Sequence, residues 1–83
     1  MKYILIVEDD LSLREGLETA LQANNISVYS TACIAEAHRV LLERKFDLLL
    51  LDYNLPDGNG IDLCREVTAV QDVPVIFLTV RDA

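Results

Sequence analysis

Carboxylate side chains follow two apolar segments of this chain, and they are the residues best suited to chemistry. Residues 4–7 are all apolar and lead directly into Glu8 and Asp9, while four leucines at 48–51 lead directly into Asp52. Three carboxylates gathered at one point repel one another unless a cation or a shared proton relieves the charge. If the two segments lie side by side, these acids predict a site that binds a cation or shares a proton.

The elements that must position these acids alternate between strand and helix. Continuous apolar runs bounded by polar residues are typical of strands buried on both faces of a parallel sheet. We predict strands at 3–7, 26–31, 46–52 and 75–78, a loop at 54–59, and three intervening helices, which begin after Asp10 or Ser12, near residue 34, and at Gly60 or Ile61. This βαβαβαβ order implies a parallel α/β sheet with helices on both faces. The carboxyl ends of its strands share one edge, so Glu8, Asp9 and Asp52 should converge there.

Helical periodicity predicts which side chains face the sheet. The expected buried positions are Leu13, Leu17, Ala20 and Leu21 in the first helix, Ile34, Ala37, Val40 and Leu41 in the second, and Ile61, Cys64 and Val67 in the third. Asp10 is expected to be a helix cap rather than a ligand. His38 has no acidic partner in view, so we expect a solvated surface residue.

Composition narrows the class of protein. The chain has 83 residues, enough for one small domain, with 52% hydrophobic residues and a net charge of −7. Without a run of Lys or Arg, this segment is not expected to bind nucleic acid or an anionic membrane. Its apolar stretches are too short for a membrane span or a signal peptide, which predicts a cytoplasmic protein. Cys33 and Cys64 are expected to be reduced, with a disulfide between them as the alternative.

Four blocks of sequence resemble the receiver domain of bacterial two-component response regulators. They are residues 4–10, residues 47–52, residues 55–60 and residues 74–79, and they occur in the family's order and with its spacing. The resemblance implies a flavodoxin-like, doubly wound parallel sheet of order 2-1-3-4, with the first and third strands as neighbours. The family pattern continues with a fourth helix, a fifth strand and a fifth helix that this sequence lacks. Residues 1–83 are therefore expected to be a truncated receiver domain.

The resemblance also assigns roles to individual residues. Asp52 would be the phosphoryl acceptor, and a sensor histidine kinase would be the phosphodonor. A Mg²⁺ ion would be held by Asp9, Asp52 and the backbone carbonyl of Asn54, with Glu8 acting directly or through water. Thr79 would contact the phosphoryl group and act as the switch residue. Such a domain is a phospho-accepting signalling switch of a transcription regulator rather than a turnover enzyme.

Departures from the family pattern leave a second function open. The family's lysine after the fifth strand is absent; Lys2 and Lys45 precede strands, so they lie at the wrong edge, and Arg81 is a weak substitute. An apolar edge strand at Val75–Leu78 is a template for pairing with another chain, so we expect a dimer or a swapped assembly. The alternative function is accordingly an association-prone stub that keeps the metal site but loses phosphorylation-dependent output.

Two enzyme classes fit the motifs poorly. Haloacid-dehalogenase-type phosphatases need a second aspartate two residues after the nucleophile, and Asn54 occupies that position. No G-x-x-x-x-G-K-[ST] motif is present, which excludes a P-loop nucleotide hydrolase.

Overall fold

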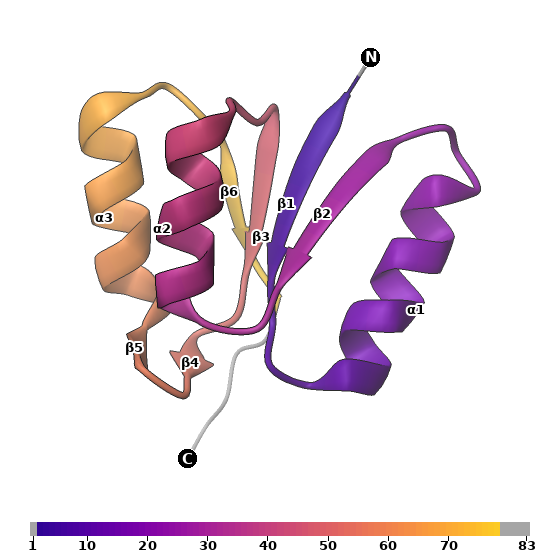
Figure 1. Cartoon of the computed structure of the whole chain (residues 1–83), viewed down its shortest axis with the longest axis horizontal. Helices are drawn as coiled ribbons and strands as arrows, with labels where there is room; N and C mark the ends of the chain where they lie inside the picture. Colours follow the sequence, from indigo (N-terminus) through magenta and orange to yellow (C-terminus); the bar gives the residue numbers. More distant parts are fainter. Residues whose placement is uncertain (1, 79–83) are drawn as a thin grey trace.

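The computed structural model describes residues 2–78, which form one parallel sheet, three helices and a small hairpin (Figure 1). Along the chain the elements are β1 (Tyr3–Val7), α1 (Leu11–Gln22), β2 (Ser27–Thr31), α2 (Ile34–Glu43), β3 (Leu48–Leu51), β4 (Asn54–Leu55), β5 (Gly58–Asn59), α3 (Gly60–Val70) and β6 (Val75–Phe77). The sheet has the order β2-β1-β3-β6, and all its pairs are parallel. The predicted α/β class and strand order are confirmed, with β6 as the fourth strand of the sheet.

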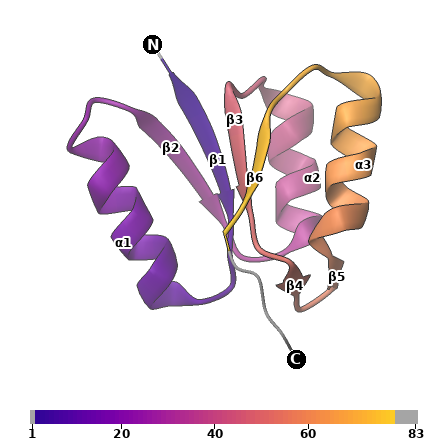
Figure 2. The same ribbon diagram turned by 180° about the vertical axis from the view of Figure 1, so that it is seen from behind.

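Helices cover both faces of the sheet. Figures 1 and 2 show α1 on one face and α2 with α3 on the other. Side chains alternate along the strands: Leu5 and Val7 join the core under α2 and α3, while Ile4 and Ile6 join the core under α1. Because successive strand residues point to opposite faces, both faces of β1 are apolar and buried.

The buried face matches the prediction in α2 and differs from it in α1 and α3. In α1, Leu17 and Leu21 pack on the sheet as expected, but Leu13 is 38% exposed and Ala20 is exposed. In α3, Val67 and Cys64 pack against the core as expected, but Ile61 belongs to neither core cluster. The fully buried Leu63 was not among the predicted positions. The predicted face of α2 is confirmed, because Ile34, Ala37, Val40 and Leu41 all pack against the core.

The segment predicted as a loop is a hairpin. Strands β4 and β5 pair antiparallel, with Asn54 opposite Asn59 and Leu55 opposite Gly58. Leu55 is only 8% exposed and belongs to the core under α2 and α3. Burial of this one side chain fixes the segment against the domain. The turn-forming residues around Leu55 gave no indication of this packing.

Two sequence expectations concern the thiols and the membrane. Cys33 and Cys64 are both free, as predicted, so the disulfide alternative is wrong. Within residues 2–78, no helix has the length and apolar character that a membrane crossing requires.

Candidate functional site

The acids that follow β1 and β3 meet at one edge of the sheet. Val7 and Leu51 are paired in register, and the Asp52 N–H donates to the Val7 carbonyl at 2.9 Å. On the other side, the Glu8 N–H donates to the Thr31 carbonyl at 3.0 Å. One carboxylate oxygen from each of Glu8, Asp9 and Asp52 lies within 4.8 Å of the others. The structure therefore brings the three predicted acids together, and we call them the acidic cluster.

Glu8 is the most unusual member of the acidic cluster. Its side chain is only 2% exposed, and its Oε2 atom accepts a hydrogen bond from the Asp10 N–H at 3.0 Å. Its Oε1 atom is buried without a hydrogen-bond partner among the described residues. Burial, reinforced by the charge of Asp52, raises the pKa of Glu8 to about 7, although the Asp10 N–H acts in the opposite direction. An oxygen in this situation calls for a proton or a metal ion.

Asp52 and Asp9 complete the cluster from two different environments. Asp52 is 4% exposed, and its Oδ1 atom accepts from the Tyr53 N–H at 2.8 Å. Asp9, in contrast, is exposed. The cluster is therefore buried on the side of β1 and β3 and open to solvent at Asp9.

The donor set of the cluster fits a hard divalent cation. Mg²⁺ prefers oxygen ligands and is commonly held by one or two carboxylates together with water. The unpaired Glu8 oxygen and the mutual repulsion of three carboxylates are both relieved by such an ion. The residues present therefore fit a magnesium site.

Arg14 supplies positive charge near the cluster, and sequence reasoning missed it. Its Nη1 atom donates to the Glu8 carbonyl at 2.8 Å from the end of the first turn of α1. Helix α1 is placed for this contact by Asp10, which is the N-cap and accepts from the Leu13 N–H at 3.1 Å. The prediction of Asp10 as a cap is thus confirmed.

Two other predicted site residues are not brought into the cluster by the contacts of the described residues. Asn54 is exposed at the start of β4, two residues after Asp52, and the role of its carbonyl stays a prediction. Thr79 lies outside the described residues, so its role also stays a prediction.

Gly60 holds the start of α3 directly against the backbone of Asp52 and Tyr53, which follow β3. Its N–H donates to the Tyr53 carbonyl at 2.8 Å. A Cβ atom placed on Gly60 would lie 2.1 Å from the Asp52 carbonyl oxygen, a distance that no side chain tolerates. The close approach of these two backbones requires glycine at this position.

Asp57 is a second residue that sequence reasoning missed. Its Oδ1 and Oδ2 atoms accept hydrogen bonds from the Ile34 and Ala35 N–H groups at the start of α2, at 2.8 and 3.0 Å. These bonds lower the pKa of Asp57, so the exposed carboxylate is held in its ionised form.

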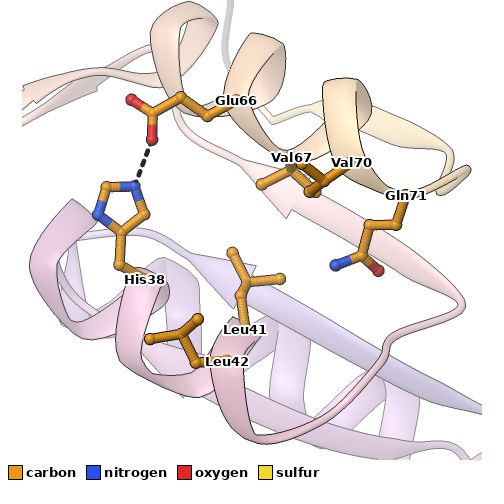
Figure 3. Close-up of a pocket in the computed structure, with 7 residues that line it drawn as sticks. All are labelled: His38, Leu41, Leu42, Glu66, Val67, Val70 and Gln71. Atoms are coloured by element: carbon orange, nitrogen blue, oxygen red, sulfur yellow. Dashed lines mark hydrogen bonds and ion pairs between the residues drawn. The ribbon is translucent and has the colours of Figure 1, made fainter.

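An apolar groove lies between α2 and α3, lined by residues distinct from the acidic cluster (Figure 3). Its volume is about 390 Å³, and its walls include Leu42 and Val70, which are 89% and 81% exposed. His38 and Glu66 bridge the two helices, with 2.7 Å between Nε2 and Oε2. His38 is exposed, so its predicted surface position is confirmed. The expectation that it has no acidic partner is wrong, because the partner comes from another helix 28 residues away in sequence.

The chain matches the family model described as the response regulator receiver domain over residues 4–83. It belongs to this family. The receiver domain is 40% identical over 80 residues to the aerobic respiration control protein ArcA of Escherichia coli (strain K12), covering 96% of this chain and 34% of that protein. It is 38% identical over 81 residues to the KDP operon transcriptional regulatory protein KdpE of the same strain, covering 98% of this chain and 36% of that protein. The receiver domain thus spans about a third of the length of these curated relatives.

Solved structures agree with this assignment. The MaeR response regulator bound to beryllium trifluoride superposes with a TM-score of 0.90 at 37% identity, over 100% of this chain and 70% of that chain. The receiver domain of the TMAO respiratory system response regulator TorR gives a TM-score of 0.86 at 32% identity, over 93% of this chain and 64% of that chain. This chain therefore shares the fold and the family of signalling domains from two-component systems.

Proposed function

We propose that this receiver domain accepts a phosphoryl group on Asp52 and thereby acts as a signalling switch. The observation that carries the proposal is the acidic cluster: Asp52 is buried at the end of β3, beside Glu8 and Asp9, at the carboxyl edge of the sheet. Ligands of open parallel sheets bind at this edge. The strand order changes direction between the neighbouring strands β1 and β3, and the acidic cluster lies at this change of order.

The transfer itself is a displacement at phosphorus. An Asp52 carboxylate oxygen attacks the phosphorus of a phosphohistidine, and a new O–P bond forms while the P–N bond breaks. The imidazole nitrogen leaves with the electron pair of that bond. Because the acceptor is itself an anion, positive charge beside it must lower the repulsion between acceptor and phosphoryl oxygens.

Mg²⁺ is the cofactor that we propose for this step. Asp9, Asp52 and the Asn54 carbonyl would hold it, with Glu8 acting directly or through water. When bound, the ion would neutralise negative charge on the transferring group. Glu8 supports the proposal, because its buried Oε1 atom has no hydrogen-bond partner among residues 2–78.

Family resemblance supplies the remaining roles. We infer that the Thr79 hydroxyl contacts the phosphoryl group, since this residue directly follows Leu78 in the block that resembles the family. The phosphodonor would be a sensor histidine kinase. Transcription regulation is proposed as the output because relatives such as KdpE carry that name, and the output would depend on parts of the relatives that this chain does not match.

Intact-mass spectrometry after incubation with acetyl phosphate and Mg²⁺ tests the proposal. We expect a single phosphoryl adduct on the parent chain and none on Asp52→Asn. Asp72→Asn is the matched control, because this exposed aspartate lies in the turn before β6, at the opposite edge of the sheet. An adduct that persists in Asp52→Asn would show that Asp52 is not the acceptor.

A second candidate property is self-association through β6. Among the described residues β6 pairs only with β3, and its Ile76 side chain is 52% exposed. An exposed apolar edge strand offers unpaired backbone groups to a second copy. Light scattering of the 83-residue chain at micromolar concentration should give the mass of a dimer, and Ile76→Lys should shift it toward a monomer.

A further inference from the structure

Helix α2 has no N-terminal cap from its own segment. Its N-cap residue, Cys33, has extended backbone and makes no side-chain hydrogen bond to the helix. The first N–H groups of a helix have no partner within the helix, and a carboxylate that accepts from them stabilises the helix. Here the carboxylate comes from Asp57, which is 22 and 23 residues away from the two donors, Ala35 and Ile34.

The same contact brings the hairpin backbone against α2. Asp57 lies in the turn between β4 and β5, and Figure 1 shows this hairpin beside the first turn of α2. A Cβ atom placed on Gly58 would lie 2.7 Å from the Cδ1 atom of Ile34. Ile34 therefore meets the hairpin twice, through its N–H group and through its side chain.

The base of the hairpin lies between the end of β3 and the start of α3. Asn54, two residues after Asp52, is paired with Asn59 across the hairpin. The Asn59 Oδ1 atom accepts from the Ile61 N–H at 2.7 Å and caps α3. The segment that carries Asn54 is thus held at its base by α3 and at its turn by α2.

We infer that Asp57 is a positioning residue, which anchors the hairpin turn to α2 and so fixes the Asn54 backbone for cation binding. The inference rests on the metal site proposed above. A backbone carbonyl has no rotamers with which to correct its position, so its usefulness as a ligand depends on how firmly its segment is held. Mutation of groups that hydrogen-bond to direct ligands typically costs roughly 10- to 100-fold in metal affinity, and Asp57, which acts through the hairpin, is expected at the lower end of that range.

The experiment compares Mg²⁺ affinity with helix stability in the 83-residue chain. Mg²⁺ alone is titrated by calorimetry, well below the melting temperature of each variant, and thermal unfolding is followed in parallel by circular dichroism. Asp57→Ala should weaken Mg²⁺ binding by roughly tenfold and lower the melting temperature. Asp72→Asn, an exposed aspartate at the other edge of the sheet, is the control for loss of one charge.

A double variant separates positioning from simple capping. Cys33→Ser gives α2 a local cap, because the extended backbone at Cys33 suits a serine N-cap. In Cys33→Ser combined with Asp57→Ala, the helix is capped again while the link to the hairpin stays broken. We expect this variant to regain melting temperature but not Mg²⁺ affinity.

The outcomes distinguish this inference from the proposed function. If the double variant regains both properties, or if Asp57→Ala binds Mg²⁺ as the parent does, Asp57 is only a helix cap and the inference is overturned. In both cases the parent still binds Mg²⁺ and the proposed metal site stands. If the parent itself binds no Mg²⁺ at millimolar concentration, the metal site and the inference fall together.

Discussion

Glu8 and Asp57 are both carboxylates at the carboxyl edge of the sheet, yet their surroundings are opposite. Glu8 is 2% exposed, and one of its oxygens is buried without a hydrogen-bond partner among the described residues. Asp57 is exposed, and both of its oxygens accept backbone hydrogen bonds. Burial raises the pKa of Glu8, whereas the Ile34 and Ala35 N–H groups lower the pKa of Asp57. The exposed carboxylate is therefore held in its ionised form by backbone donors, whereas the buried carboxyl group of Glu8 favours its protonated form.

Replacing Glu8 with glutamine should give the largest change. The folded-state pKa of Glu8 is about 7 against an ordinary value of 4.5, so the stability due to its protonation is full below pH 4.5 and is lost as pH rises through 7. As the pH rises from 4.5 to above 7, the free energy of unfolding of Glu8→Gln should therefore increase by roughly 3 kcal/mol relative to that of the parent. Urea denaturation at a series of pH values, without metal, measures the difference.

Asp57→Asn is the control of opposite sign for that experiment. Because the pKa of Asp57 is lowered from 3.8, its stabilisation is present above that pH and is lost as pH falls through the folded-state value. The parent should therefore exceed Asp57→Asn in stability at neutral pH, and the two should approach each other in acid. If both variants showed the same sign of pH dependence, the opposite pKa shifts assigned to Glu8 and Asp57 would be wrong.

Mg²⁺ should stabilise the parent by an amount close to the effect of Glu8. At a free concentration 100 times Kd, a ligand that binds only the folded state contributes about 2.7 kcal/mol. The melting temperature should rise with Mg²⁺ and return when the metal is chelated, and Asp9→Asn should reduce the rise. An unchanged melting temperature at millimolar Mg²⁺ would argue against a formed site.

Two glycines should respond to alanine in opposite directions. A Cβ at Gly60 would clash with the Asp52 carbonyl at 2.1 Å, so Gly60→Ala should lower the free energy of unfolding by about 1–3 kcal/mol. Gly16 lies within α1 with nothing within 4 Å of its added Cβ, so Gly16→Ala should raise that free energy by about 1 kcal/mol. Chemical denaturation measures the free energy of unfolding of both variants. An unchanged value for Gly60→Ala would show that the two backbones separate easily.

The smallest effect should come from Glu66, a carboxylate that is neither buried nor a cap. Its side chain is 59% exposed and pairs with His38, which is 47% exposed. Exposed pairs of this kind contribute roughly 0.2–1 kcal/mol. A double-mutant cycle with Glu66→Gln and His38→Ala should give a coupling energy within that range. A larger value would show that this pair stabilises the fold more than an ordinary exposed pair does.

Sequence pattern predicted the parallel sheet and the convergence of the acids on one edge, and the resemblance to the receiver family supplied the strand order. The apolar runs at β1 and β3 are strong signals, and their acids meet because these two parallel strands are neighbours and end at the same edge. The prediction that Glu8, Asp9 and Asp52 converge followed from this topology and needed no side-chain detail.

Contacts between elements could not be predicted in the same way. The bonds from Asp57 to α2 and from His38 to Glu66 join segments 22 to 28 residues apart, and periodicity says nothing about which exposed residues of two helices meet. The hairpin could not be predicted because its strands have only two residues each, too few to show an alternation of apolar and polar residues. Leu63 was missed because the rotation of α3 is set by packing on the sheet, which shifts the buried face from the expected one.

The double connection between α2 and α3 has a mechanical consequence. The hairpin caps both helices, through Asp57 and Asn59, and the contact between His38 and Glu66 joins them again farther along. Because one hairpin accepts hydrogen bonds from the first turns of both helices, a shift of residues 54–59 should move the first turns of α2 and α3 together. Residue 54 lies two residues beyond Asp52, so the hairpin is the shortest covalent route from the end of β3 to the starts of both helices.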